Sequence, residues 1–199
     1  MLLSRLLSRL LSRLILVTVS SSALLLASCA TLSVEECMVG NWQAIGYNDG
    51  VAGYPPSRLA AHSKACAKAN VAADYESWER GRQLGLKQYC TVNNAYNIGR
   101  RGLELNRVCP ASSTMRLQQA NQQGREYYRL NKQLNDDRAL LEEYEADYTK
   151  LRAGQMLDFE DEKEARRYLL SLPAKLRRLE REIIYTERQL SRLNYVHRD

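Results

Sequence analysis

Few side chains in this sequence are placed to do chemistry, and the first candidates are a histidine and a cysteine. His62 and Cys66 are four residues apart, so a helix would bring them to one face, where an imidazole can activate a thiol. Other catalytic centres need a carboxylate pair in a cleft or a metal cluster, and the second of the two histidines is His197, near the chain end. We expect Cys66 to form a disulfide instead. The sequence therefore predicts no catalytic residue, no metal and no cofactor.

A glycine-rich segment, residues 46–53, is the next candidate, because such loops can cradle phosphate groups. It follows no predicted strand and lacks a Gly-Lys-Ser/Thr element, so we do not expect phosphate binding. Within it, Asn48-Asp49-Gly50 is typical of a turn. The same region of the chain holds several aromatic residues, and core packing is their expected use, with a glycan-binding face as the alternative. They are Trp42, Tyr47, Tyr54, Trp78 and Tyr89.

The start of the chain has the order of a signal peptide. Arginines without acidic residues precede an apolar stretch, Leu14–Leu26, that is too short for a spanning helix. The segment ends in Leu26-Ala27-Ser28-Cys29, which resembles the lipobox of bacterial lipoproteins. The resemblance implies removal of residues 1–28 and a diacylglycerol on Cys29, with membrane lipid as its partner. By similarity to enterobacterial sorting, Ala30 after that cysteine implies the outer membrane, facing the periplasm.

Cleavage there changes the charge, and acylation of Cys29 leaves an even number of free cysteines. The net charge falls from +6 to +3, because three arginines and no acids leave, and we expect no nucleic-acid partner. Once Cys29 is acylated, the remaining cysteines predict two disulfides in an oxidising compartment. None forms a Cys-x-x-Cys pair, so zinc is disfavoured. The shortest loops join Cys37 to Cys66 and Cys90 to Cys109.

Composition divides the mature chain near Pro110 into two regions after a short tether at 29–36. Residues 37–110 hold all four of these cysteines and both tryptophans. Helix caps predict short helices over 58–69, 75–88 and 92–105, starting after Ser57, Asp74 and Thr91, with Asn70 in a left-handed position. Glycines inside these helices either let another helix approach closely or end them. They are Gly81, Gly85, Gly99 and Gly102, and Gly46 and Gly50 repeat the spacing upstream.

Several motifs of this middle region occur together. They are Gly40-Asn41-Trp42, Ile45-Gly46-Tyr47-Asn48-Asp49-Gly50, His62 with Cys66, Gly81-Arg82-x-x-Gly85-Leu86-x-x-Tyr89-Cys90 and Val108-Cys109-Pro110. Together they resemble DUF2799, a family of uncharacterised proteobacterial lipoproteins. The resemblance covers about the middle 90 residues and implies a compartment and a domain, but no activity.

From Thr114 the pattern is that of long helices. Apolar residues recur at alternating three-residue and four-residue spacing from Tyr127 to Leu151 and again from Leu169 to Leu193, which is typical of a coiled-coil seam. Ala153-Gly154-Gln155 is a turn signal between them. Residues 111–199 are therefore expected to form an antiparallel hairpin, whose first arm, 114–152, is roughly 58 Å long. Pro173 should break or kink the returning arm.

The predicted fold class is mainly α, a disulfide-stapled cluster of short helices followed by this hairpin. We expect a lipid-anchored envelope protein that is not an enzyme and whose hairpin binds an envelope protein or a second copy. Four side chains beside the seam, which are Tyr128, Tyr144, Leu170 and Ile184, are expected to remain partly exposed. The alternative is a glycan-binding or hydrolytic module with Asp49, Asp74 or His62 near its site.

Overall fold

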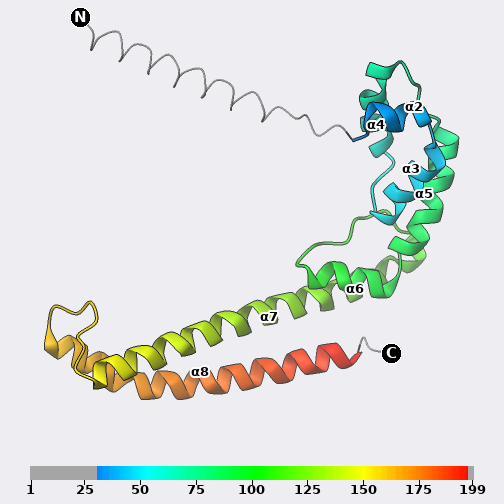
Figure 1. Ribbon diagram of the computed structural model, residues 1–199. Coiled ribbons are helices and arrows are strands. Elements are labelled where there is room, and N and C mark those ends of the chain that lie inside the picture. Colours follow the sequence, from blue (N-terminus) through cyan, green and yellow to red (C-terminus); the bar gives the residue numbers. More distant parts are fainter. Residues whose placement is uncertain (1–30, 197–199) are drawn as a thin grey trace, which may run out of the picture.

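The computed structural model describes residues 31–196, which form a head of short helices and a long helical hairpin (Figure 1). No strand occurs in this part of the chain, and no helix in it is both long and apolar enough to cross a membrane. Cys29, the expected signal peptide and His197 lie outside the described residues. The elements are α2 (Val34–Val39), α3 (Trp42–Val51), α4 (Arg58–Cys66), the 3₁₀ helix η2 (Ala67–Ala69), α5 (Tyr75–Tyr89), α6 (Val92–Arg100), α7 (Ala111–Arg152) and α8 (Glu162–Val196).

Side-chain caps start most helices of the head. Asp74 accepts a hydrogen bond from the Ser77 amide at 3.0 Å, and Thr91 accepts one from the Asn94 amide at 3.2 Å, which confirms both predicted caps. Ser33 forms a capping box with Glu36 at the start of α2. The predicted cap at Ser57 is wrong, because this residue already has helical dihedrals after Pro55 and Pro56 and its side chain makes no capping bond.

Three expectations about helix ends are settled by backbone conformation. Asn70 ends the η2 segment with φ 54°, in the expected left-handed conformation. The helix expected over 92–105 ends already at Arg100, and Gly102 follows with φ +79°. This positive φ is easily adopted by glycine but not by other residues, so Gly102 takes the helix-ending role. Gly53 has φ +73° and ends α3 in the same way.

The turn predicted at Asn48-Asp49-Gly50 is wrong, because these residues lie inside α3. Asn41 caps this helix by accepting a hydrogen bond from the Ala44 amide at 3.1 Å. Packing against α5 then outweighs the local turn preference of these three residues. A Cβ added to Gly46 would lie 1.9 Å from the Trp78 carbonyl oxygen, and one added to Gly81 would lie 2.0 Å from the Gln43 carbonyl oxygen. Glycine is therefore required on both helices for their backbones to touch.

The same device joins α6 to the first part of α7. A Cβ on Gly99 would lie 2.2 Å from the Asn121 carbonyl oxygen, and one on Gly124 would lie 2.1 Å from the Tyr96 carbonyl oxygen. The buried Asn121 side chain reinforces the contact by donating to the carbonyls of Ala95 and Leu103. The head thus extends into α7, past the composition boundary at Pro110.

Two disulfides lie in the head, and their pairs are the ones with the shortest loops. Cys37–Cys66 joins α2 to the end of α4, and Cys90–Cys109 joins the end of α5 to the segment before α7. Cys37 and Cys66 are buried in a small core with Leu32, Trp42 and Trp78. The chain is therefore folded onto the head from Thr31 and Leu32 onward, within the segment 29–36 expected to be a tether.

Beyond the head, α7 and α8 pack antiparallel through the predicted apolar seam (Figure 1). Leu130 and Leu134 pack with Ile183 and Leu190 near the head. A second cluster near the turn is built around Leu151, Ala165 and Leu172. At 1.5 Å per residue, the 42 residues of α7 extend for about 63 Å.

Of the two outcomes expected at Pro173, a break or a kink, the break does not occur, because α8 continues through this residue. Proline removes one backbone donor and disfavours a helix interior. Here the neighbouring Leu172 is fully buried at 0% exposure in the seam, which holds both sides of the proline in one helix. Just before the proline, Ser171 donates its hydroxyl to the Tyr168 carbonyl at 2.7 Å.

Candidate functional site

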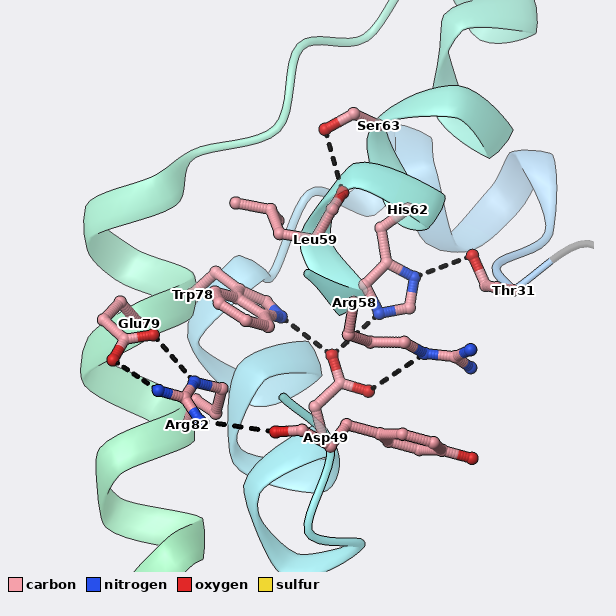
Figure 2. Close-up of polar contacts among 10 residues, drawn as sticks. Thr31, Asp49, Arg58, Leu59, His62, Ser63, Trp78, Glu79 and Arg82 are labelled. Carbon is pink, nitrogen blue, oxygen red and sulfur yellow. Dashed lines mark hydrogen bonds and ion pairs between the residues drawn. The ribbon is translucent and has the colours of Figure 1, made fainter. Parts of the chain in front are cut away.

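The most concentrated group of polar side chains lies inside the head around Asp49 (Figure 2). Asp49 comes from α3 and is 6% exposed. Its Oδ2 accepts hydrogen bonds from His62 Nε2 at 2.7 Å and from Trp78 Nε1 at 2.8 Å. Its Oδ1 lies 3.7 Å from Nε of Arg58. Donors from α4 and α5 therefore surround both oxygens of a buried carboxylate.

His62 continues this network to the first described residue of the chain. Because an ionised carboxylate can only accept, His62 Nε2 must carry a proton. His62 Nδ1 lies 2.8 Å from the Thr31 hydroxyl, so that hydroxyl donates to the ring when the ring is neutral. Thr31, His62 and Asp49 form a continuous hydrogen-bonded chain, which fixes the segment just after position 30 to the head.

This chain has the residue types of a hydroxyl–imidazole–carboxylate triad, but its burial argues against catalysis. A triad needs an open position where a substrate carbonyl meets the hydroxyl and oxyanion donors. The His62 residue is only 2% exposed, and both of its ring nitrogens are occupied. Cys66, the other half of the candidate pair, is 0% exposed and bonded to Cys37. The arrangement can hold structure together, and it offers no room for a substrate.

A second polar cluster lies beside the first on α5. Arg82 is buried and donates from Nε and Nη2 to the two carboxylate oxygens of Glu79, both at 2.8 Å, and from Nη1 to the Tyr54 carbonyl at 3.3 Å. These hydrogen bonds from Arg82 hold the pKa of the Glu79 carboxyl below its usual value. The guanidinium of Arg58 lies 4.3 Å from the centre of the Tyr54 ring. Both arginines thus attach the loop after α3 to its neighbours.

The residues named for a glycan-binding site do not converge on one surface. Asp49 and His62 are buried together, whereas Asp74 caps α5 and takes part in neither cluster. Hydrogen bonds from the Ser77 side chain and amide lower the pKa of the Asp74 carboxyl. Of the aromatic residues, Trp42, Trp78 and Tyr89 are buried in the core as expected, and Tyr47 and Tyr54 remain exposed.

Sequence reasoning named Asp49 and His62 but missed three of their partners, Thr31, Arg58 and Trp78. Arg58 and His62 are four residues apart on α4, so helical spacing already placed them on one face. The other contacts join residues far apart in sequence, separated by 29 for Asp49 with Trp78 and 31 for Thr31 with His62. No spacing rule within a single element could have found those.

The outer face of α8 is the second candidate site. Opposite the seam runs a stripe of exposed residues at three-residue and four-residue spacing, here called the α8 stripe. Its members are Leu170, Ala174, Arg177, Arg181, Ile184 and Arg188. Leu170 is 71% exposed and Ile184 is 48% exposed. Tyr128 is also exposed and Tyr144 is half-buried, so all four side chains expected to stay partly exposed do so.

The structure is therefore that of an all-helical, disulfide-bonded protein in which a small head carries a long antiparallel hairpin. Residues 41–126 match the family model DUF2799, described as a protein of unknown function, which supports the resemblance of this part of the chain to that family. The match begins at the cap of α3 and runs through the contact of Gly99 with Gly124. No curated protein and no solved structure matched the chain. No catalytic family is indicated.

Proposed function

We propose that the protein is a lipid-anchored, periplasmic protein of the outer membrane that has no catalytic activity and whose hairpin binds another envelope protein. The lipobox ending in Cys29 supports the anchor. The two disulfides support an oxidising compartment such as the periplasm. The buried, fully engaged Asp49 and His62 favour a structural role for the head over a hydrolytic one.

The observation that carries the binding role is the α8 stripe. On this helix face exposed Leu170 and Ile184 lie among three arginines, and arginine is enriched where proteins bind one another. The outer face of α7 differs, because Lys132, Asn135, Ala139, Glu142 and Ala146 occupy it and all are exposed. The two outer faces of one hairpin therefore provide a test surface and a matched control surface.

Photocrosslinking in intact cells tests this role. A photoreactive amino acid at position 184 in the α8 stripe should give one discrete product with a single other envelope protein, identified by mass spectrometry. The same amino acid at position 139 of α7 should not give that product. A product of two copies of this chain would show self-association instead. Equal products from both positions, or none from either, would count against a specific binding face.

The anchor has its own test. Metabolic labelling with a palmitate analogue should mark the wild-type protein and not the Cys29→Ala variant. Cell fractionation should place the labelled protein in the outer membrane. Equal labelling of both proteins would refute lipidation at Cys29.

A further inference from the structure

The junction between the proposed lipid anchor and the folded head is short. Thr31 already contacts His62 at 2.8 Å, Leu32 is 8% exposed, Ser33 forms the capping box, and Cys37 is bonded to Cys66. Cys29 is two residues before Thr31, and two residues of chain span at most about 7 Å. No flexible linker therefore separates the anchor position from the head.

The first helix after this junction exposes apolar side chains. Val34 is 52% exposed, Met38 is 68% exposed and Val39 is 78% exposed. Val34 and Met38 are one turn apart and share a face of α2, and Val39 follows at its end. The neighbouring Glu36 is turned back onto the Ser33 amide at 2.7 Å, so the capping box engages its carboxylate. Cys37 holds α2 to the head, because it is buried and bonded to Cys66.

We propose that the head docks directly on the lipid bilayer, with Val34, Met38 and Val39 of α2 entering the interfacial region beside the acyl chains on Cys29. The inference rests on the lipidation proposed above. Acyl chains inserted in the membrane would hold Cys29 at the membrane surface. Thr31 would then lie within about 7 Å of Cys29, and so close to that surface. Apolar side chains at that depth leave water for the boundary between headgroups and acyl chains.

This placement also gives a role to the hydrogen-bonded chain of Thr31, His62 and Asp49. By fixing Thr31, it fixes the direction in which the chain leaves the head and thus which surface faces the lipid. The connection between α7 and α8, which is the tip of the hairpin, lies at the opposite end of the molecule from α2 (Figure 1). A head held flat on the bilayer would give the hairpin one fixed orientation, whereas a long tether would let it rotate freely.

Fluorescence quenching by lipid tests the docking. The native residues Trp42 and Trp78 are 5% and 0% exposed. Their fluorescence is a background signal, which is measured on the wild-type protein and subtracted. Met38→Trp adds a tryptophan to the proposed contact, and Leu170→Trp adds one to an exposed position on α8. The full lipidated chains are reconstituted in phosphatidylethanolamine and phosphatidylglycerol vesicles, with and without a lipid brominated near the headgroup end of its acyl chain.

We expect bromine to quench the added fluorescence of Met38→Trp and to leave that of Leu170→Trp unchanged. Vesicle flotation and the palmitate label test lipidation at Cys29 separately from docking of α2 on the bilayer. A labelled protein that floats with the vesicles but shows no quenching at position 38 overturns the docking and leaves the anchor intact. A protein that carries no label and does not float overturns both. Circular dichroism checks that each variant is folded.

A spacer provides a second test that leaves the head itself unchanged. A flexible Gly/Ser segment inserted between Ala30 and Thr31 in the Met38→Trp protein would free the head from the membrane surface. Quenching should then fall while the protein still floats. Quenching that persists with the spacer shows that α2 binds lipid without the constraint of the short junction, and this result would overturn the argument from chain length.

Discussion

Two parts of α7 pack against their neighbours in opposite ways. Near its start, Gly124 meets the backbone of α6, and the two helices touch without side chains between them. Further along, Leu130, Leu134 and Leu151 interlock with side chains of α8. The same kind of backbone contact joins α3 to α5. The glycines that allow it there are Gly46, Gly50, Gly81 and Gly85.

The difference shows what each kind of contact tolerates. Glycine contacts have no free space, since an added Cβ would lie 1.9–2.2 Å from a carbonyl oxygen of the partner helix at all six helical glycines. The leucine seam depends instead on side-chain volume, so it is damaged by removing atoms. The head should therefore be sensitive to added atoms and the hairpin to lost ones.

The largest expected effect is on the glycine contact of the head. Gly81→Ala places its Cβ 2.0 Å from the Gln43 carbonyl oxygen, which belongs to backbone and cannot move aside. We expect the free energy of unfolding to fall by more than about 3 kcal/mol. Denaturant unfolding followed by circular dichroism measures it.

Gly154→Ala is the matched control for that substitution. Gly154 lies in the hairpin turn with φ +81° and has nothing within 4 Å of the added Cβ. Only backbone strain of about 1 kcal/mol is expected. If both substitutions cost the same, the close approach of α3 and α5 is not what Gly81 provides.

The next largest loss of stability is expected in the hairpin, when a buried side chain is shortened. Leu172 is fully buried at 0% exposure, so Leu172→Ala should cost about 3 kcal/mol. Leu170→Ala, two residues away and 71% exposed, should change stability by less than about 0.5 kcal/mol. Hydrogen exchange should show faster opening of α8 in the first variant, with the head amides less affected. Similar effects of the two would mean that the seam does not run through Leu172.

The elements that were predictable from sequence are those with local signals. The caps at Asp74 and Thr91 follow from side chains that bond amides three residues on. The hairpin follows from the spacing of its leucines, which the structure places in the seam. The exposure of the outer face of α8 was predictable from the same periodicity, because Ile184 lies opposite that seam.

The misjudged elements are those decided by distant contacts. Asn48-Asp49-Gly50 has turn chemistry, yet packing of Gly46 and Gly50 on α5 makes it helical. Pro173 is a helix breaker by itself, yet buried Leu172 holds α8 together across it. The Asp49 cluster was only partly foreseeable, since its partners come from three separate segments.

Loss of a helix cap should have a smaller effect and tests the local part of the head. Thr91→Ala removes the acceptor for the Asn94 amide at the start of α6 and should cost about 1 kcal/mol. Ser57→Ala should cost almost nothing, because Ser57 makes no capping bond. Thermal unfolding of both variants measures the difference. A large loss from Ser57→Ala would show that a cap forms there in solution.

The smallest effect is expected from two acid–arginine pairs of equal spacing, one in the head and one on the hairpin, whose contributions to stability depend on pH. Glu79 with Arg82 and Glu126 with Arg129 are both i,i+3 pairs, but the Arg82 side chain is 5% exposed and the Arg129 side chain is 61% exposed. Hydrogen bonds from the arginine lower the pKa of the glutamate in each pair. A carboxyl whose pKa is lower in the folded state stabilises the protein fully above its unfolded value, and this contribution is lost as the pH falls through the folded value.

The contribution of both pairs to stability should therefore fall below about pH 4.5, the ordinary pKa of a glutamate side chain, and the head pair should lose more. Solvent screens the exposed Glu126 pair, whereas protonation of Glu79 leaves the buried Arg82 guanidinium with a weaker partner. In the Glu79→Gln variant the free energy of unfolding should fall clearly less than in the wild type as the pH is lowered. In Glu126→Gln the difference from the wild type should be slight. Denaturant unfolding from pH 7 down to about pH 3 gives both curves. Added salt should reduce the effect of Glu126 and leave that of Glu79 nearly unchanged. If the two variants instead gave the same curve, Arg82 would be as accessible to water as Arg129, and the head would not be the drier of the two regions.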